Sequence, residues 1–204
     1  QWVNFSIVSD KLNFPQLYLN TILVTIMMIV GQILIVTICA YAFDRLNFPG
    51  KNVLFMGMLA LMMVPGQIFI IPRFKLMVNL GLTNTLVGLV LPGLFNIFGV
   101  FLMRQFFTGV PDELLDAGRI DGLSEFGVYT RIALPLVTPA LSALGIFTFL
   151  GNWNSFLWPV IALDSKEKYT ITLGLAQFSA ENASQWELIM TGASVATIPI
   201  IIIF

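Results

Sequence analysis

The sequence predicts an all-α membrane protein with about five transmembrane helices. Hydrophobic residues make up 57% of the 204 positions and charged residues only 10%, whereas about a quarter of a soluble domain is usually charged. The few charges are also confined to short clusters. The apolar runs between them are long enough to cross about 30 Å of hydrocarbon as helices. Because a segment in lipid must satisfy its own backbone groups, helix is the secondary structure expected of each run.

Five apolar runs carry the expected transmembrane helices. Four of them are free of charge between two charged residues: Lys11 and Asp44, Lys51 and Arg73, Lys75 and Arg104, and Arg131 and Asp164. The fifth begins after Glu187 and is still apolar at Phe204. In chain order, the expected helices are 17–43, 52–72, 84–107, 136–161 and 186–204. Buried helices of a soluble bundle are the alternative explanation of these runs.

The composition argues against several kinds of site. A net charge of −1 argues against a broad nucleic-acid-binding face. With no histidine and a single cysteine, Cys39, the chain offers neither an internal disulfide nor a His or multi-cysteine metal site. Gly50 and Lys51 lack the upstream glycine of a phosphate-binding loop. We therefore expect a chain that is not an enzyme and holds no metal, nucleotide or other cofactor.

Both ends of the sequence suggest a longer protein. Gln1 is not an initiator, and the last apolar run continues to Phe204 without a polar flank. We interpret residues 1–204 as a single transmembrane domain truncated at both ends. A preceding helix would bring the total to about six and place both termini on the same side. Lysine and arginine are balanced between the two expected faces, so the positive-inside rule does not orient the chain.

The polar segment, residues 111–135, is expected to form a helix, a glycine corner and a second helix. A proline followed by two acidic residues favours a helix start, because acidic groups interact well with the positive end of the helix dipole. Gly122 can adopt the left-handed conformation that ends a helix. Ser124 is a suitable N-cap for the second helix, which must end near Leu134 because a proline follows.

The first helix of the polar segment is expected to be amphipathic. Its apolar residues, which can enter a groove in a partner protein, are Leu114, Leu115 and Ile120. Its charged residues, expected at the rim of that contact, are Asp116, Arg119 and Asp121. The alternative is an ordinary amphipathic loop that rests on the bilayer surface and contacts no partner.

The spacing within this segment resembles the EAA loop of permease subunits from binding-protein-dependent ABC importers, and places that loop at 109–135. Asp116-Ala117-Gly118 precedes Gly122, and nine residues separate Gly122 from Ile132. The departures from the family are Asp116 in place of glutamate and Gly118 in place of a second alanine. The resemblance implies that the loop docks into an ATPase subunit. The residues implied in this coupling are Leu115, Asp116, Ala117, Gly118, Asp121, Gly122, Leu123, Ile132, Leu134 and Pro135.

The same resemblance implies the other partners and the location of the chain. These are a second, homologous permease subunit, two ATPase subunits that bind ATP and Mg, and an extracytoplasmic solute-binding protein, in the cell (inner) membrane of a bacterium or archaeon. Residues 65–200 are similar to carbohydrate-type permeases such as the second permease subunit of the maltose importer, notably at 79–85 and 152–159. The implied solute is an oligosaccharide or related sugar, and a glycerol phosphate ester is the alternative.

Amides and aromatic rings in the fourth apolar run are candidates for the solute path. They are Phe149, Asn152, Trp153, Asn154 and Phe156. An amide in a long uncharged segment needs a hydrogen-bonding partner, and a sugar could supply one. Packing between helices explains the same residues equally well.

Two other functional classes are open to the sequence. An ion-coupled secondary transporter usually carries ionisable residues inside the membrane, and the four bounded apolar runs contain none. A membrane-embedded enzyme would need a metal cluster, a nucleophile with its base, or paired carboxylates. The sequence pattern supplies none of these, so both classes are less favoured than an importer permease.

Overall fold

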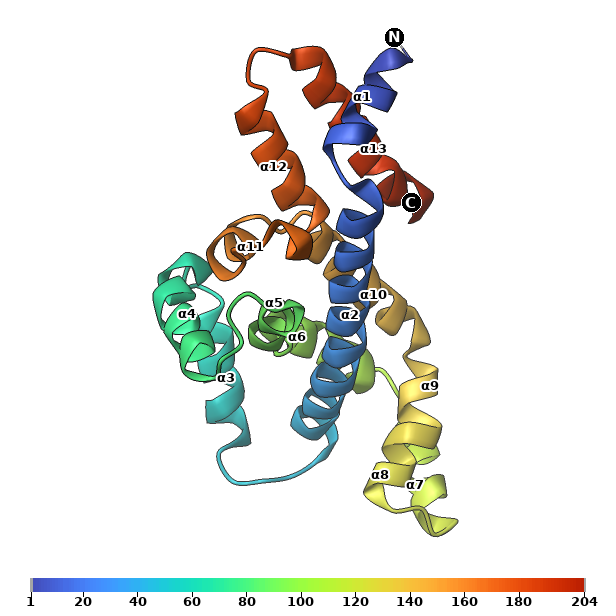
Figure 1. Cartoon of the computed structure of the whole chain (residues 1–204). Coiled ribbons are helices and arrows are strands. Elements are labelled where there is room, and N and C mark those ends of the chain that lie inside the picture. Colours follow the sequence, from blue (N-terminus) through green and yellow to red (C-terminus); the bar gives the residue numbers. More distant parts are fainter. Residues whose placement is uncertain (1, 204) are drawn as a thin grey trace. The chain divides into compact units, whose positions relative to one another are not determined.

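In the computed structural model, residues 2–203 are described, and all regular structure in that range is helical (Figure 1). The chain divides into two compact units. The first unit comprises Gln1–Met27, Phe69–Pro92 and Phe149–Phe204, and the second comprises Met28–Ile68 and Gly93–Thr148. Each unit therefore combines segments that are distant in the sequence. The boundaries of the single transmembrane domain expected at 1–204 stay a prediction.

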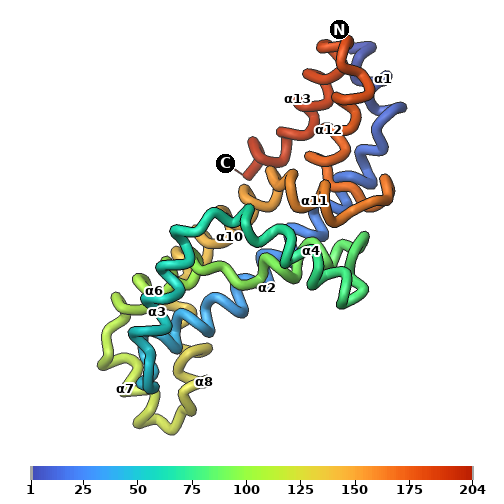
Figure 2. Tube along the Cα trace, turned by 90° about the vertical axis from the view of Figure 1, so that its left-hand side faces the viewer, coloured from blue at the N-terminus to red at the C-terminus, as the bar shows by residue number. Residues whose placement is uncertain are grey.

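The first unit contains the two ends of the described chain. Its helices are α1 (Val3–Lys11), the first half of α2 (Phe14–Arg45), α4 (Ile70–Asn79), α5 (Leu86–Val90), α11 (Leu157–Ala162), α12 (Ile171–Glu181) and α13 (Trp186–Ile203). Both α1 and α12 pack against α13 (Figure 2). Small residues permit this close approach, as they do between membrane helices generally. A Cβ on Gly192 would lie only 2.9 Å from the Leu175 side chain.

The second unit contains the polar segment. Its helices are the second half of α2, α3 (Lys51–Leu61), α6 (Ile97–Thr108), α7 (Asp112–Ile120), α8 (Glu125–Val128), a π-helical turn η3 (Tyr129–Ala133), α9 (Leu134–Leu136) and most of α10 (Thr138–Trp153). One apolar core joins them, and its fully buried members include Val36, Val100, Phe107, Leu115 and Val128. The polar segment is therefore packed onto α2 and α6 through the same core.

The structure confirms an all-α, polytopic membrane protein. Helices α2 and α13 are each long and apolar enough to span a membrane, and the total reaches five if each of three broken helix pairs counts as one span. The first expected helix, 17–43, lies within α2. The last, 186–204, coincides with α13 over its described residues.

The prediction of continuous helices for the other three runs was wrong. The run 52–72 is interrupted after α3, and 84–107 is interrupted between α5 and α6. In the run 136–161, α10 ends at Trp153 and α11 begins anew. A proline lies in or beside two of these breaks, at Pro65 and Pro92. Proline interrupts a helix because it lacks the backbone N–H and its ring crowds the preceding turn.

A further bend of 78° separates the α8–α9 stretch from α10. Pro139 has no N–H with which to reach the carbonyl of Pro135, four residues earlier. The Thr138 hydroxyl donates to that carbonyl instead, at 2.6 Å. At the bend, the Thr138 side chain therefore supplies the hydrogen bond to the Pro135 carbonyl that the backbone of Pro139 cannot.

Candidate functional site

The backbone of the polar segment is the predicted helix, glycine corner and helix. Helix α7 begins at Asp112 and ends at Ile120. Gly122 follows in the left-handed conformation, with φ +86°. Its N–H donates to the Arg119 carbonyl at 3.0 Å, and the Leu123 N–H donates to the Gly118 carbonyl at 3.0 Å. These two bonds form a Schellman cap, which satisfies the free carbonyls at the end of α7.

The second helix starts at the predicted cap. The Ser124 hydroxyl accepts from the Gly127 N–H at 3.2 Å. In both views, α7 and α8 lie side by side around the glycine corner (Figures 1 and 2). The helix then widens into the π turn, where the Leu134 N–H donates to the Tyr129 carbonyl five residues earlier. Such turns are frequent at functional sites, and this one was not predicted from the sequence.

One side of α7 is built for contact with the chain's own core. Leu115 is fully buried, so it cannot enter a partner's groove, which corrects the expectation for its side chain. Gly118, one turn later, faces Ile132, and a Cβ at this position would lie 2.3 Å from the Ile132 Cδ1. A glycine at position 118 thus leaves the space that the Ile132 side chain fills.

The opposite side of the corner exposes apolar side chains. Ile120 is 86% exposed, Phe126 is 67% exposed and Leu114 is 45% exposed. Ile120 ends α7 and Phe126 lies in the first turn of α8, so both are next to the corner. Exposed large apolar side chains of this kind are typical of a protein or membrane contact. Phe126 was not among the predicted residues. Its sequence signal is one apolar residue in the first turn after the Ser124 cap.

A small ionic network fixes the charges around the corner. The Arg119 guanidinium donates to Asp116 at 2.6 Å and to both oxygens of Glu125 at 2.7 and 3.2 Å. These bonds, chiefly those to Glu125, raise the pKa of Arg119 above its usual value. Arg119 is therefore paired within the chain, whereas the sequence suggested a rim charge for a partner. Glu125 was missed, because nothing in its spacing linked it to Arg119.

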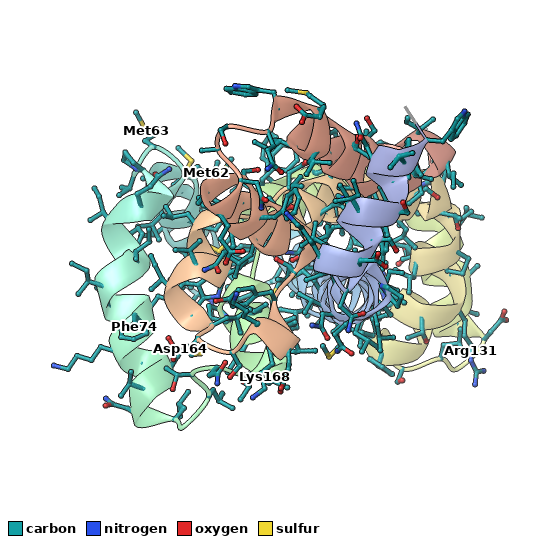
Figure 3. The ribbon with its side chains drawn as sticks, turned by 45° about the horizontal axis from the view of Figure 1, so that its top comes forward. Met62, Met63, Phe74, Arg131, Asp164 and Lys168 are labelled. Carbon is teal, nitrogen blue, oxygen red and sulfur yellow. The ribbon has the colours of Figure 1, made fainter. Side chains whose placement is uncertain are left out.

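The other predicted coupling residues fall into two groups. Those exposed on the surface are Asp116, Ala117, Asp121, Gly122 and Pro135. Those packed against the core of the second unit are Leu123, Ile132 and Leu134. Arg131, next to Ile132 in the sequence, is exposed, and its side chain points away from the ribbon (Figure 3). The polar segment thus presents one surface outward and anchors the other, and its role in coupling stays a prediction.

The predicted solute-path residues lie in the first unit, and three of the five make packing contacts there. Phe149 and Trp153 are buried and their rings stack with centroids 5.2 Å apart. The Trp153 indole donates to the Ala196 carbonyl at 3.2 Å, and the Asn152 amide donates to the Thr25 hydroxyl at 2.7 Å. These contacts are those of the helix-packing alternative.

The remaining two candidates are more accessible. Asn154 is exposed and its amide donates to the backbone carbonyl of Leu150 at 2.9 Å. Phe156 is 44% exposed. A role of these five residues in solute passage stays a prediction.

Residues 32–204 match a model of the family described as "Binding-protein-dependent transport system inner membrane component". The chain belongs to this family. As an inner membrane component it is a multi-pass protein of the cell membrane. The match includes the whole polar segment.

Curated members of the family support the match over nearly the whole chain. The arabinooligosaccharides transport system permease protein AraQ of Halalkalibacterium halodurans is 36% identical over 185 residues, which are 91% of this chain and 66% of that protein. The Bacillus subtilis AraQ is 36% identical over 92% of this chain and 66% of that protein. The sn-glycerol-3-phosphate transport system permease protein UgpE of Salmonella typhi is 32% identical over 99% of this chain and 72% of its own length. The chain thus spans just under two thirds of the length of the AraQ proteins.

A solved structure shares the fold. A chain of a bacterial ABC transporter involved in the import of the acidic polysaccharide alginate superposes with a TM-score of 0.86. The superposition covers 98% of this chain and 76% of the other, at 23% sequence identity. The two chains therefore share one fold over nearly the whole of this chain.

Proposed function

We propose that this chain is the membrane-spanning permease subunit of an ATP-driven importer, and that the corner between α7 and α8 docks into an ATPase subunit. The observation that carries the proposal is the two-sided construction of that corner. Exposed Ile120 and Phe126 offer apolar contact to a partner. Buried Leu115 ties the same helix to the core of the second unit. A force that the ATPase subunit exerts on Ile120 and Phe126 would therefore be transmitted through Leu115 to the core of the second unit.

Chemistry and transport are divided between chains in this proposal. Two ATPase subunits bind ATP and Mg and hydrolyse the nucleotide, while this chain carries no catalytic residue and no cofactor. Closure of the ATPase pair displaces α7, and the stretch from α8 through α9 passes the motion to α10. A second, homologous permease subunit completes the pathway, and an extracytoplasmic solute-binding protein delivers the solute.

The proposed solute is an oligosaccharide or related sugar. The AraQ relatives are named for arabinooligosaccharides and the UgpE relative for sn-glycerol-3-phosphate. The AraQ relatives are the more similar of these, at 36% identity against 32% for UgpE, and this favours a sugar.

Site-directed crosslinking tests the docking surface. With Cys39 replaced by alanine, a single cysteine at Ile120 of the complete protein should crosslink to a co-expressed ATPase subunit. A cysteine at Trp186 is the matched control, because that side chain is 66% exposed but lies at the start of α13, away from the polar segment in sequence. Failure of the Ile120 crosslink in a complex that still contains the ATPase would contradict the proposal.

The ion-coupled alternative is separated by a transport assay. Proteoliposomes holding the complete protein without ATPase subunits would be given an ion gradient and labelled arabinotriose. We expect no uptake under these conditions. Uptake driven by the gradient alone would instead support a secondary transporter.

A further inference from the structure

Arg45, the last residue of α2, joins three helices of the second unit through one side chain. The side chain is only 11% exposed. Its guanidinium donates to the carbonyls of Phe107 and Val110, the latter at 2.6 Å, and pairs with the carboxylate of Asp112. Its Nε lies 2.7 Å from the carboxylate of Asp44. The end of α2, the end of α6 and the first residue of α7 therefore meet at one cation.

The chemistry of these partners calls for an arginine. The last carbonyls of a helix have no donor within the helix and form the negative end of its dipole. The guanidinium is planar, permanently charged and carries five N–H donors in a fixed fork. It can therefore bond the carbonyl of Phe107 in the last turn of α6, that of Val110 just after it, and the carboxylate that starts α7 at the same time. A lysine presents a point charge and cannot reproduce this fork.

A second bond links the same turn to α2. The Thr108 hydroxyl donates to the Asp44 carboxylate at 2.7 Å. The Asp44-Arg45 pair thus holds the connection between α6 and α7 from both of its ends. This connection is short, since only three residues separate Thr108 from Asp112, so fixing it also fixes where α7 begins.

The same side of α2 forms hydrogen bonds with α8 and the π turn, which make up the second half of the polar segment. The Tyr41 hydroxyl donates to Glu125 at 3.2 Å, and the Thr37 and Tyr129 hydroxyls share a hydrogen bond of 2.7 Å. Residues 37, 41 and 45 are spaced by four, so they share one side of the helix. Arg45 is the member of this row that reaches α7.

We propose that Arg45 is a positioning residue that fixes α7 to α2, so that displacement of the corner moves α2 together with α10. The proposal rests on the docking role proposed above, and it adds a path of force that does not run through the chain of the polar segment. Arg45 itself does not contact the ATPase, because its side chain is enclosed by Phe107, Val110 and Asp112.

Spin-label distances in the complete protein test this path. With Cys39 replaced by alanine, labels are placed at Glu113 on α7 and at Ile38 on α2, which are both exposed and lie outside the proposed docking surface. The distance distribution is recorded in the assembled transporter, first without nucleotide and then with Mg and a non-hydrolysable ATP analogue. With Arg45 present, we expect a narrow distribution that keeps its mean when the analogue binds.

The variants separate positioning from simple folding. Arg45→Gln should broaden the distribution roughly twofold, because the first turn of α7 then loses its direct bond to α2. Arg45→Lys should be intermediate. Asp112→Asn changes a carboxylate whose side chain is 79% exposed, so it carries the test even if Arg45→Gln fails to insert. The double variant Arg45→Gln with Asp112→Asn should be no broader than Arg45→Gln, as expected of two groups in one interaction. Lys75→Gln, at an exposed cation in α4, is the control and should change nothing.

The outcomes distinguish this proposal from the docking role. An unchanged, narrow distribution in Arg45→Gln and in Asp112→Asn would overturn the positioning role. Absence of the ATPase subunit from the purified wild-type complex would instead overturn the docking role. The nucleotide-free distributions would still decide whether Arg45 fixes α7.

Discussion

At the residue scale, Gly118 and Gly122 of the polar segment are required for different physical reasons. Gly118 is buried against Ile132, and a methyl group there would crowd the Ile132 Cδ1. Gly122 is exposed, and a Cβ there would meet nothing within 4 Å. Its constraint is the backbone, because φ is +86° and L-residues pay a steric penalty in that region. The sequence predicts the conformational role of Gly122, whereas the contact of Gly118 with Ile132, fourteen residues later, is not visible in the local pattern.

Gly118→Ala should therefore destabilise the protein through packing. The extra methyl group costs about 1–3 kcal/mol when it overpacks a core, and this is partly offset by the gain of about 1 kcal/mol in helix propensity. Removing the colliding atom with Ile132→Val should restore stability, so that the double variant is more stable than the sum of the single changes predicts. Reversible unfolding in detergent measures this. Additive free energies of unfolding would contradict the close contact.

Gly122→Val should act through the backbone alone. A left-handed conformation costs an L-residue about 1–2 kcal/mol, and a β-branched side chain is the least tolerant of it. Gly122→Asn is the matched control, since asparagine visits this region readily. We expect the valine variant to lose most of its co-purifying ATPase and the asparagine variant to keep it. Equal retention by both variants would show that the corner does not need this conformation.

At the element scale, local signals predicted the polar segment well and the spans less well. The start of α7, the corner at Gly122 and the Ser124 cap could be predicted from the sequence. Each of them depends only on residues within about one helical turn of its own position. Hydropathy reports only that a run belongs in lipid, and it does not distinguish a straight helix from a broken one. The π turn at Tyr129–Ala133 was also missed. Its Tyr129 hydroxyl bonds Thr37 of a distant helix, a contact that no local pattern contains.

The bend before α10 provides a prediction at this scale. Thr138→Val removes the hydroxyl that satisfies the Pro135 carbonyl. The free energy of unfolding should fall by about 1 kcal/mol, the usual net value of one hydrogen bond. Ser142→Ala is the control, because its hydroxyl makes a longer bond of 3.3 Å and its side chain is exposed. Chemical unfolding in detergent would reveal the difference, and equal losses would argue against a special role for the Thr138 bond.

At the scale of the whole molecule, each unit is assembled from segments far apart in the chain. The first unit illustrates how a single side chain joins such segments. Asn84 has a positive φ of 53°, and its amide donates to the Ser165 hydroxyl at 2.7 Å. Its side-chain oxygen accepts from the N–H groups of Asp164 and Ser165 at 3.2 and 3.1 Å. Asn84 lies within residues 79–85, whose sequence resembles carbohydrate-type permeases, but its partners lie some 80 residues away and could not be predicted from that local resemblance.

Two substitutions at Asn84 separate its conformation from its contacts. The Lys168 ammonium also donates to the Asn84 backbone carbonyl at 2.6 Å. Asn84→Gly keeps the left-handed backbone but loses the three side-chain bonds, at a net value of about 1 kcal/mol each. Asn84→Ala loses the same bonds and adds about 1–2 kcal/mol of backbone strain.

We therefore expect both Asn84 variants to lower the free energy of unfolding, with alanine the more harmful by about 1–2 kcal/mol. Amide hydrogen exchange should localise the loss to residues 81–85 and 162–168, because these are the segments that Asn84 joins. Protection of the polar segment is the internal control, since it belongs to the second unit. If exchange rose equally in both units, the two would unfold together and Asn84 would stabilise the chain as a whole rather than the first unit.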